Sequence, residues 1–215
     1  MKYITKNDEP QSFKNWKDND KMYKSGKPNW NRFNHSKYQD VKTELLESLK
    51  KEQGYICCYC EVKLQENDYH PEHLKPKSKG RYPELQLEYE NLLCSCQLET
   101  ESGEPRHCGN SKGSWYDKDL LVSPLDANCE LKFKYNYDGT IKYTDEASKL
   151  TIIHLQLSID KLNDLRNKAI EPFLIDPITF EEISKEDAKI FANAYLNKNS
   201  GQYNEFYTTI KYLFG

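Results

Sequence analysis

Cysteine spacing in the middle of the chain predicts a metal site. Cys57 and Cys60 form a C-x-x-C pair, and a two-residue gap lets both thiolates reach one tetrahedral zinc ion. Further cysteines follow on either side of a polar loop, residues 97–106. Zinc bound here would contribute its binding free energy to folding. The preferred ligands of this structural zinc are Cys57, Cys60, Cys96 and Cys108.

The other cysteines have plainer interpretations. Cys94 is an alternative to Cys96, because a one-residue gap disfavours binding of both thiolates to one ion. Cys58 and Cys129 are predicted to be packed thiols, since a free cysteine behaves as a small buried hydrophobe. In a reducing compartment, seven cysteines indicate metal ligation or free thiols and not disulfides.

A Glu-His pair lies between the two halves of the predicted zinc site. At a bend, one of Glu72 and His73 can hold a divalent ion while the other addresses a water molecule. Phosphodiester hydrolysis needs both a hard cation at the leaving oxygen and a base whose pKa is near neutrality. A local basic strip follows and suits phosphate groups. It consists of Lys75, Lys77, Lys79 and Arg81.

Composition limits how such a site reaches its substrate. The 215 residues carry a net charge of -3, from 31 basic and 34 acidic side chains. A protein that binds nucleic acid by itself is normally basic, so a partner that supplies affinity is expected. No window approaches the roughly 18 apolar residues of a membrane span, and the first residues lack the apolar segment of a signal peptide. We therefore expect a cytoplasmic protein.

Two segments lead into the first cysteine pair. Residues 1–35 are predicted to form an irregular polar arm, whose aromatic side chains either pack on the body or dock a partner. Packing is the favoured interpretation, and the side chains are Phe13, Trp16, Tyr23, Trp30 and Phe33. Residues 38–53 have apolar positions at helical spacing and a glycine stop, which predicts an amphipathic helix. Residues 54–114 are turn-rich, as expected where metal replaces an apolar core.

The C-terminal part is predicted to contain a hairpin and helices. Aromatic residues alternate over 133–137, and Asp138-Gly139 provides a tight turn before a second strand, which predicts a β-hairpin. Apolar spacing predicts helices over 147–171, 185–196 and 202–214, the second with a Ser184-x-x-Asp187 capping signal. Arg166 is interpreted as a surface charge, with an inter-subunit contact as the alternative. The chain is thus divided into an arm (1–35), a zinc-stapled core (36–125) and a hairpin-and-helix region (126–215) packed on that core as one unit.

These motifs resemble those of the HNH endonuclease family. The shared pattern is Cys57-x-x-Cys60, Glu72-His73 with Pro76 and Ser78, Asn91-Leu92, Cys96, Cys108 and Lys112. More narrowly, the chain resembles the HNH subunit of the Septu anti-phage defence system (PtuB-like), which also accompanies some retrons. The segments that carry this likeness are His70-x-Glu72-His73-x-x-Pro76-Lys77-Ser78, Asn91-Leu92-Leu93, His107-Cys108-Gly109 and Ser123-Pro124-Leu125. The likeness covers most of the chain and is most specific over residues 53–112.

The resemblance implies an α+β fold with a ββα-metal (HNH, His-Me finger) core, a structural zinc, a β-hairpin and flanking helices. It implies that His73 is the general base, that Glu72 binds a catalytic Mg²⁺ or Mn²⁺ ion, and that Asn91 orients His73 by hydrogen bonding. It also implies an SMC- or ABC-like ATPase partner that controls access to DNA. In retron systems the partners would include a reverse transcriptase and its msDNA. The expected function is DNA cleavage within an anti-phage defence complex.

Gly109 departs from the family pattern, which often places a histidine or asparagine metal ligand directly after the last cysteine. Asn110 is the preferred substitute ligand, and His107 is the alternative. His70 has two interpretations, a structural or hydrogen-bonding role and a place in the active site. Three lysines are left to bind substrate phosphates, namely Lys75, Lys77 and Lys112.

Two other functions are compatible with the sequence. A zinc-ribbon adaptor would bind a partner or nucleic acid without cleaving it, and the missing ligand after Cys108 favours that function. A nuclease acting on RNA or tRNA would use the same chemistry, since nothing in the motifs reads bases. Cleavage assays with divalent metals distinguish the three functions.

Overall fold

The computed structural model describes residues 1–22, 28–98 and 103–215. Its α-helices are α1 (Gln11–Met22), α2 (Trp30–Phe33), α3 (Gln39–Glu52), α4 (Cys108–Lys112), α5 (Glu146–Leu155), α6 (Asp160–Ile170), α7 (Lys185–Leu196) and α8 (Tyr207–Phe214). Its strands are β1 (Tyr69–His73), β2 (Leu92–Cys96), β3 (Phe133–Tyr135) and β4 (Ile141–Tyr143). Short 3-10 segments are η1 (Ser36–Tyr38), η2 (Pro83–Leu85), η3 (Tyr89–Asn91), η4 (Cys129–Lys132) and η5 (Glu171–Phe173). The mixture of helices with two small sheets confirms the predicted α+β class.

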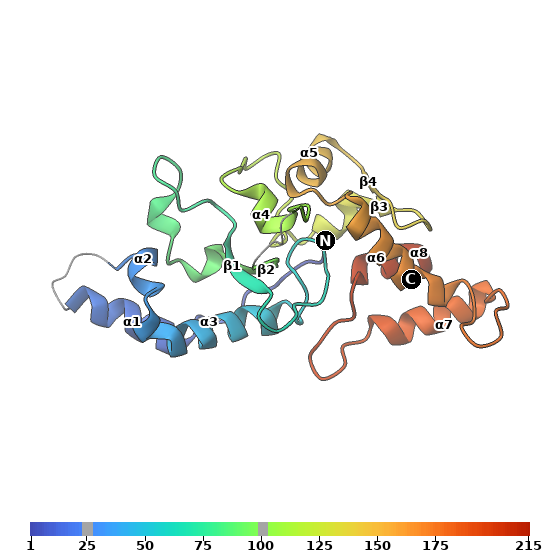
Figure 1. Ribbon diagram of the computed structural model, residues 1–215, viewed down its shortest axis with the longest axis horizontal. Helices are drawn as coiled ribbons and strands as arrows, with labels where there is room; N and C mark the ends of the chain where they lie inside the picture. The colour runs from blue at the N-terminus through green and yellow to red at the C-terminus, as the bar shows by residue number, and fades with distance from the viewer. Residues whose placement is uncertain (23–27, 99–102) are drawn as a thin grey trace.

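An antiparallel strand pair and one short helix form the centre of the molecule (Figure 1). β1 pairs with β2 so that Tyr69 lies opposite Cys96 and His73 opposite Leu92. The polar loop leads from β2 into α4, and α4 contacts β2. This order brings the Glu-His pair of β1 and the cysteines of β2 and α4 into one region.

The N-terminal arm is helical, which corrects the irregular structure predicted for it. Phe13 and Trp16 lie three residues apart on α1, both are buried, and both rings pack against Phe33. α1 in turn contacts α3, so the arm is part of the packed body. The packing interpretation of the arm's aromatic residues holds for these side chains; Tyr23 lies outside the described residues. Two aromatic positions on an otherwise polar segment were too weak a signal for a helix.

The predicted α3 and α7 helices and the β-hairpin are confirmed, with β3 and β4 in antiparallel register. The helix predicted over 147–171 is instead divided, because Gln156 adopts a left-handed conformation (φ 52°) that ends α5. Arg166 of α6 is buried and not a surface charge. Its guanidinium donates hydrogen bonds to the carbonyl oxygens of Leu157, at 2.6 Å, and Gly139, at 3.3 Å. It thereby ties the α5–α6 break to the hairpin turn.

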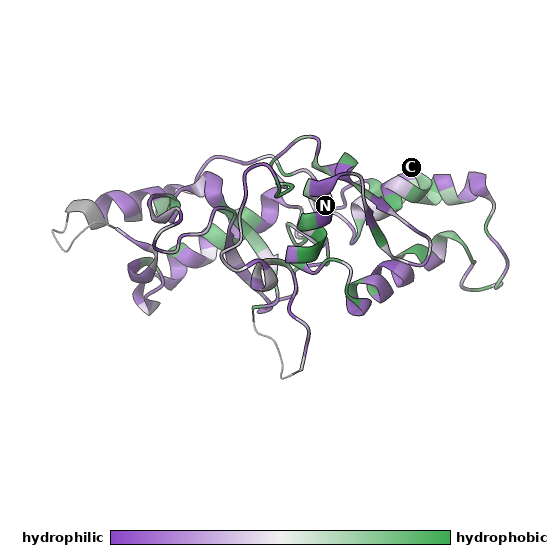
Figure 2. Cartoon of the chain, turned by 90° about the horizontal axis from the view of Figure 1, so that it is seen from above, coloured by the Kyte–Doolittle hydropathy of each residue, from purple (hydrophilic) through white to green (hydrophobic). Residues whose placement is uncertain are grey.

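One apolar cluster connects most parts of the chain. It extends from Met1 and Ile4 through α1, α3, β2 and the hairpin to Leu162 of α6. A smaller cluster joins α6, α7 and α8 through Ile170, Ala192 and Ile210. Figure 2 shows hydrophobic residues gathered in the middle of the molecule and hydrophilic ones along the N-terminal helices. Within the described ranges, no helix has the length and apolar character to cross a membrane.

Candidate metal centre and active site

Four buried thiols converge beside the central strand pair. The sulfur atoms of this cysteine cluster all lie within 4.8 Å of one another. Cys60 Sγ and Cys96 Sγ are 3.7 Å apart, and thiolates on a tetrahedral zinc ion with bonds of about 2.3 Å are separated by about 3.8 Å. The donors therefore fit a metal such as zinc. The cluster consists of Cys57, Cys60, Cys96 and Cys108, the set preferred from the spacing.

The pKa values of the cluster's thiols are split, since those of Cys57 and Cys60 are lowered whereas those of Cys96 and Cys108 are raised well above the usual range. Burial raises the pKa of the Cys57 thiol, but hydrogen bonds from neighbouring thiols, that of Cys108 first, bring this pKa well below its usual range. Burial raises the pKa of Cys58 and of Cys94 well above the usual range. Cys94, the alternative ligand, stays outside the cluster, and its carbonyl oxygen accepts a hydrogen bond from the Cys58 backbone amide.

His73 is buried at the end of β1 in a well-defined setting. Its Nε2 lies 3.0 Å from the carbonyl oxygen of Gln86, which can only accept, so Nε2 carries the proton and Nδ1 carries the lone pair. The ring meets Trp30 edge-on, with centroids 4.5 Å apart. Burial and then the charge of Lys77 lower the pKa of His73 to about 4. The imidazole is therefore neutral at pH 7, as a proton acceptor must be.

The Asn91 side chain makes its hydrogen bonds to the adjacent loop and not to His73, which corrects the orienting hydrogen bond inferred from the resemblance. Its Oδ1 accepts from the Lys75 amide at 2.8 Å, and its Nδ2 donates to the carbonyl oxygens of Lys75 and Leu85 at 3.0 and 3.1 Å. These bonds tie the segment after β1 to the residue before Gln86. Asn91 thus holds the loop whose backbone carbonyl binds His73.

Replacing Asn91 with alanine is expected to lower the free energy of unfolding by about 2–4 kcal/mol, because one backbone donor and two acceptors lose their partner in a buried place. Urea denaturation measures this change. Asn197→Ala on the exposed end of α7 is the matched control and is expected to change stability by less than about 0.5 kcal/mol. Equal effects of the two substitutions would contradict the tethering role.

Glu72 is held by its own set of partners. Lys112 Nζ lies 2.7 Å from Glu72 Oε1 and 3.1 Å from the carbonyl oxygen of His73, and the Tyr59 hydroxyl donates to the same Oε1 at 3.1 Å. Lys112 is buried, so the structure contradicts its assignment to substrate phosphate. Burial and proximity to the carboxylate make it an internal countercharge.

The two candidates for the last ligand of a catalytic ion lie elsewhere. The Asn110 amide is bonded to the carbonyl oxygen of Gln97. His107 lies against the cysteine cluster, with Nε2 3.5 Å from Cys96 Sγ. Position 109 is the one that faces Glu72, since a Cβ on Gly109 would lie 2.7 Å from Glu72 Oε2 and 2.9 Å from His70 Nε2.

A cavity of about 250 Å³ collects the predicted catalytic residues of β1 together with part of the basic strip. Lys77 and Ser78 also line it, and Lys77 Nζ lies 5.5 Å from the Trp30 ring centroid. Lys75 lies next to it along the chain, its Nζ 5.9 Å from the ring of Tyr82. The cavity thus combines a neutral imidazole, a carboxylate and at least one exposed ammonium group. Its lining from β1 is His70, Pro71, Glu72 and His73.

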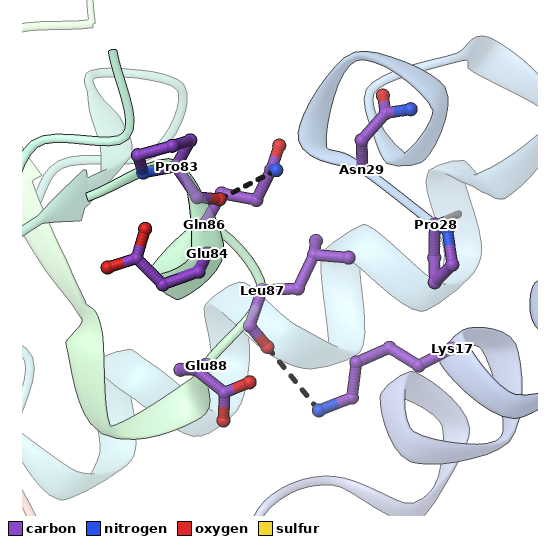
Figure 3. Close-up of a pocket in the computed structure, with 8 residues that line it drawn as sticks. All are labelled: Lys17, Pro28, Asn29, Pro83, Glu84, Gln86, Leu87 and Glu88. Atoms are coloured by element: carbon purple, nitrogen blue, oxygen red, sulfur yellow. Dashed lines mark hydrogen bonds between the residues drawn. The ribbon is translucent and has the colours of Figure 1, made fainter. Parts of the chain in front are cut away.

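A second cavity, of about 760 Å³, lies beside the segment 83–88 (Figure 3). Lys17 of α1 donates a hydrogen bond to the Leu87 carbonyl oxygen at 3.3 Å, as the dashed line in Figure 3 marks. Gln86 also borders this cavity, and its side-chain oxygen accepts from the Trp30 amide at 2.9 Å. Its described lining contains no histidine or cysteine. This region connects the N-terminal arm to the active site, because Trp30 contacts both Gln86 and the His73 ring.

Trp30, Gln86 and Tyr59 are site residues that the sequence did not reveal. Gln86 acts through its backbone carbonyl, which every residue type provides. Trp30 lies more than forty residues before His73 in the chain. Of these three residues, Tyr59 could have been recognised from the sequence, because it lies between the two cysteines of the C-x-x-C pair.

Comparison with known proteins supports an HNH endonuclease family. The chain is 30% identical over 131 residues to a candidate HNH endonuclease of retron Vc95 from Vibrio cholerae serotype O1 biovar El Tor. That match covers 60% of this chain and 62% of the relative. A candidate HNH endonuclease of retron Ec83 from Escherichia coli is 31% identical over 135 residues, which are 56% of this chain and 49% of the relative. The chain thus spans less than two thirds of either relative. No protein-family model matches it.

Proposed function

We propose that this chain is a metal-dependent HNH endonuclease subunit that hydrolyses phosphodiester bonds of DNA. In this proposal β1, β2 and α4 form the ββα-metal core, and the cysteine cluster holds a structural zinc ion. The observation that carries the proposal is the neutral, buried His73 next to Glu72 in one cavity. The retron endonuclease names of the two relatives support the same chemistry.

His73 acts as the general base through Nδ1. The Gln86 carbonyl oxygen fixes the proton on Nε2, and the Trp30 ring limits rotation of the imidazole, so Nδ1 stays available to take a proton from an attacking water molecule. A bound divalent ion, with Glu72 as a ligand, would supply charge stabilisation at the phosphate and the leaving oxygen. Lys77 and Ser78 lie where they can contact the phosphate backbone.

The arrangement also needs help to reach nucleic acid. With a net charge of -3, the chain lacks the overall positive potential of an autonomous DNA-binding protein. We therefore propose an SMC- or ABC-like ATPase partner that delivers DNA and restrains cleavage. The retron context named for the two relatives adds a reverse transcriptase and its msDNA as proposed partners in an anti-phage system.

Zinc-loaded protein purified with its partner is expected to cleave supercoiled plasmid or single-stranded DNA in Mn²⁺ or Mg²⁺, and to lose this activity when EDTA removes the weakly held ion. Gel electrophoresis of plasmid, single-stranded DNA and tRNA in parallel identifies the substrate. Cleavage confined to tRNA would replace DNA with RNA in the proposal. Absence of cleavage of every substrate, with and without the co-purified partner, would favour the zinc-ribbon adaptor.

A further inference from the structure

Position 109 requires glycine because a side chain would not fit there, and not because its backbone has a positive φ. The backbone positions of positive φ include the preceding Cys108, at 54°, and the later Gly113, at 52°, but not Gly109. What excludes a side chain at 109 is the close approach of Glu72 Oε2 and His70 Nε2, at 2.7 and 2.9 Å from the position of a Cβ. Two side chains of β1 therefore fill the place where a side chain of α4 would project.

His70 and Glu72 are suited to act together. They lie two residues apart on β1, so they face the same side of the strand, toward α4. Both approach one point at Gly109, Oε2 to 2.7 Å and Nε2 to 2.9 Å, so the two atoms converge on the same place beside α4. Both residues also line the cavity that contains His73.

The partners of Glu72 occupy one of its carboxylate oxygens and leave the other available to a cation. Lys112 and Tyr59 bind Oε1 of Glu72, which directs Oε2 toward His70. His70 Nδ1 is buried without a hydrogen-bond partner among the described residues. No described residue therefore holds the ring through Nδ1, and binding of a cation at Nε2 would place the proton on Nδ1.

We propose that His70 Nε2 and Glu72 Oε2 together bind the divalent cation of the active site, and that Gly109 provides the room for this pair. The inference rests on the proposed function and assigns the ligand that α4 does not supply. A ligand pair of one imidazole and one carboxylate favours Mn²⁺ over Mg²⁺, because Mg²⁺ prefers all-oxygen coordination and imidazole suits transition metals.

The test is Mn²⁺ binding to the zinc-loaded full chain, followed by electron paramagnetic resonance of free and bound ion. Wild-type protein is expected to bind Mn²⁺ with a ¹⁴N modulation in the spin echo, the signature of a coordinated imidazole. His70→Ala is expected to lose this modulation and to weaken Mn²⁺ binding more than about tenfold. His35→Ala, at an exposed histidine, is the matched control and keeps both properties.

Zinc content and thermal unfolding of the same samples separate coordination from a loss of folding. His70→Ala is expected to keep its zinc ion and its cooperative transition, so a lost ¹⁴N modulation reports the missing ligand. A modulation that persists in His70→Ala, or is absent from Mn²⁺-loaded wild type, overturns the assignment. DNA cleavage by the same samples keeps the two claims apart. A ¹⁴N signal without cleavage refutes the nuclease alone, whereas undiminished Mn²⁺ affinity and cleavage in His70→Ala refute the role of His70 alone.

Discussion

Cys57→Ala is expected to lose the bound zinc ion and to unfold the centre of the protein. Binding of a structural zinc ion contributes roughly 10–16 kcal/mol to the free energy of folding. The total stability of an ordinary domain is only roughly 5–15 kcal/mol. Cys57 is buried at the cluster, and the amide of Cys96 donates a hydrogen bond to its sulfur at 3.4 Å. Loss of this thiolate therefore removes a metal ligand and a contact to β2 together.

Elemental analysis and thermal denaturation monitored by circular dichroism measure this effect. Wild type should contain about one zinc ion per chain after weakly held metal is washed away, and Cys57→Ala should contain none and show no cooperative transition. The matched control is Cys129→Ala, at a buried thiol outside the cluster, which should keep its zinc and lose only about 1–2 kcal/mol. A wild-type chain that is folded and free of metal would contradict the zinc site.

His73→Ala is expected to lower the rate constant for phosphodiester cleavage by about 10²–10⁴-fold, the usual contribution of a positioned general base. The substitution leaves the cysteine cluster intact, so zinc content and the cooperative unfolding transition should persist. Single-turnover cleavage of an end-labelled DNA strand measures the rate constant.

His154→Ala is the control for this effect, because it removes a histidine outside the Glu-His pair. The His154 ring stacks on Trp115, with ring centroids 4.0 Å apart. The control should cleave at nearly the wild-type rate. Undiminished cleavage by His73→Ala would refute the assignment of the base.

Local sequence patterns predicted those features that depend on spacing alone. The C-x-x-C pair identified two members of the cysteine cluster, and the polar loop between Cys96 and Cys108 identified the others. Periodicity located α3, α7 and the hairpin, since apolar residues recur at the period of each element. The helix over 147–171 was predicted as continuous because its apolar period persists across the left-handed Gln156, which no glycine or proline marks.

The roles of individual polar groups depended on burial and long-range contacts, which spacing does not report. Lys112 has the residue type of a phosphate ligand, but its burial beside Glu72 makes it a countercharge. Asn91 was expected at the ring of His73, yet its amide satisfies three backbone groups of the adjacent loop. In the first turn of α4, position 109 faces Glu72 and position 110 does not. The Asn110 side chain instead donates a hydrogen bond to the Gln97 carbonyl oxygen.

The most direct test of the central claim uses an activated diester, thymidine 5′-(p-nitrophenyl phosphate), because it requires neither nucleic-acid affinity nor a partner. Zinc-loaded wild type in Mn²⁺ is predicted to release p-nitrophenol, and His73→Ala with the same zinc content is predicted to release it only at the background rate. Equal release by the two proteins, or none by a wild type that carries its zinc and binds Mn²⁺, would contradict the assignment of Glu72 and His73 as the active site.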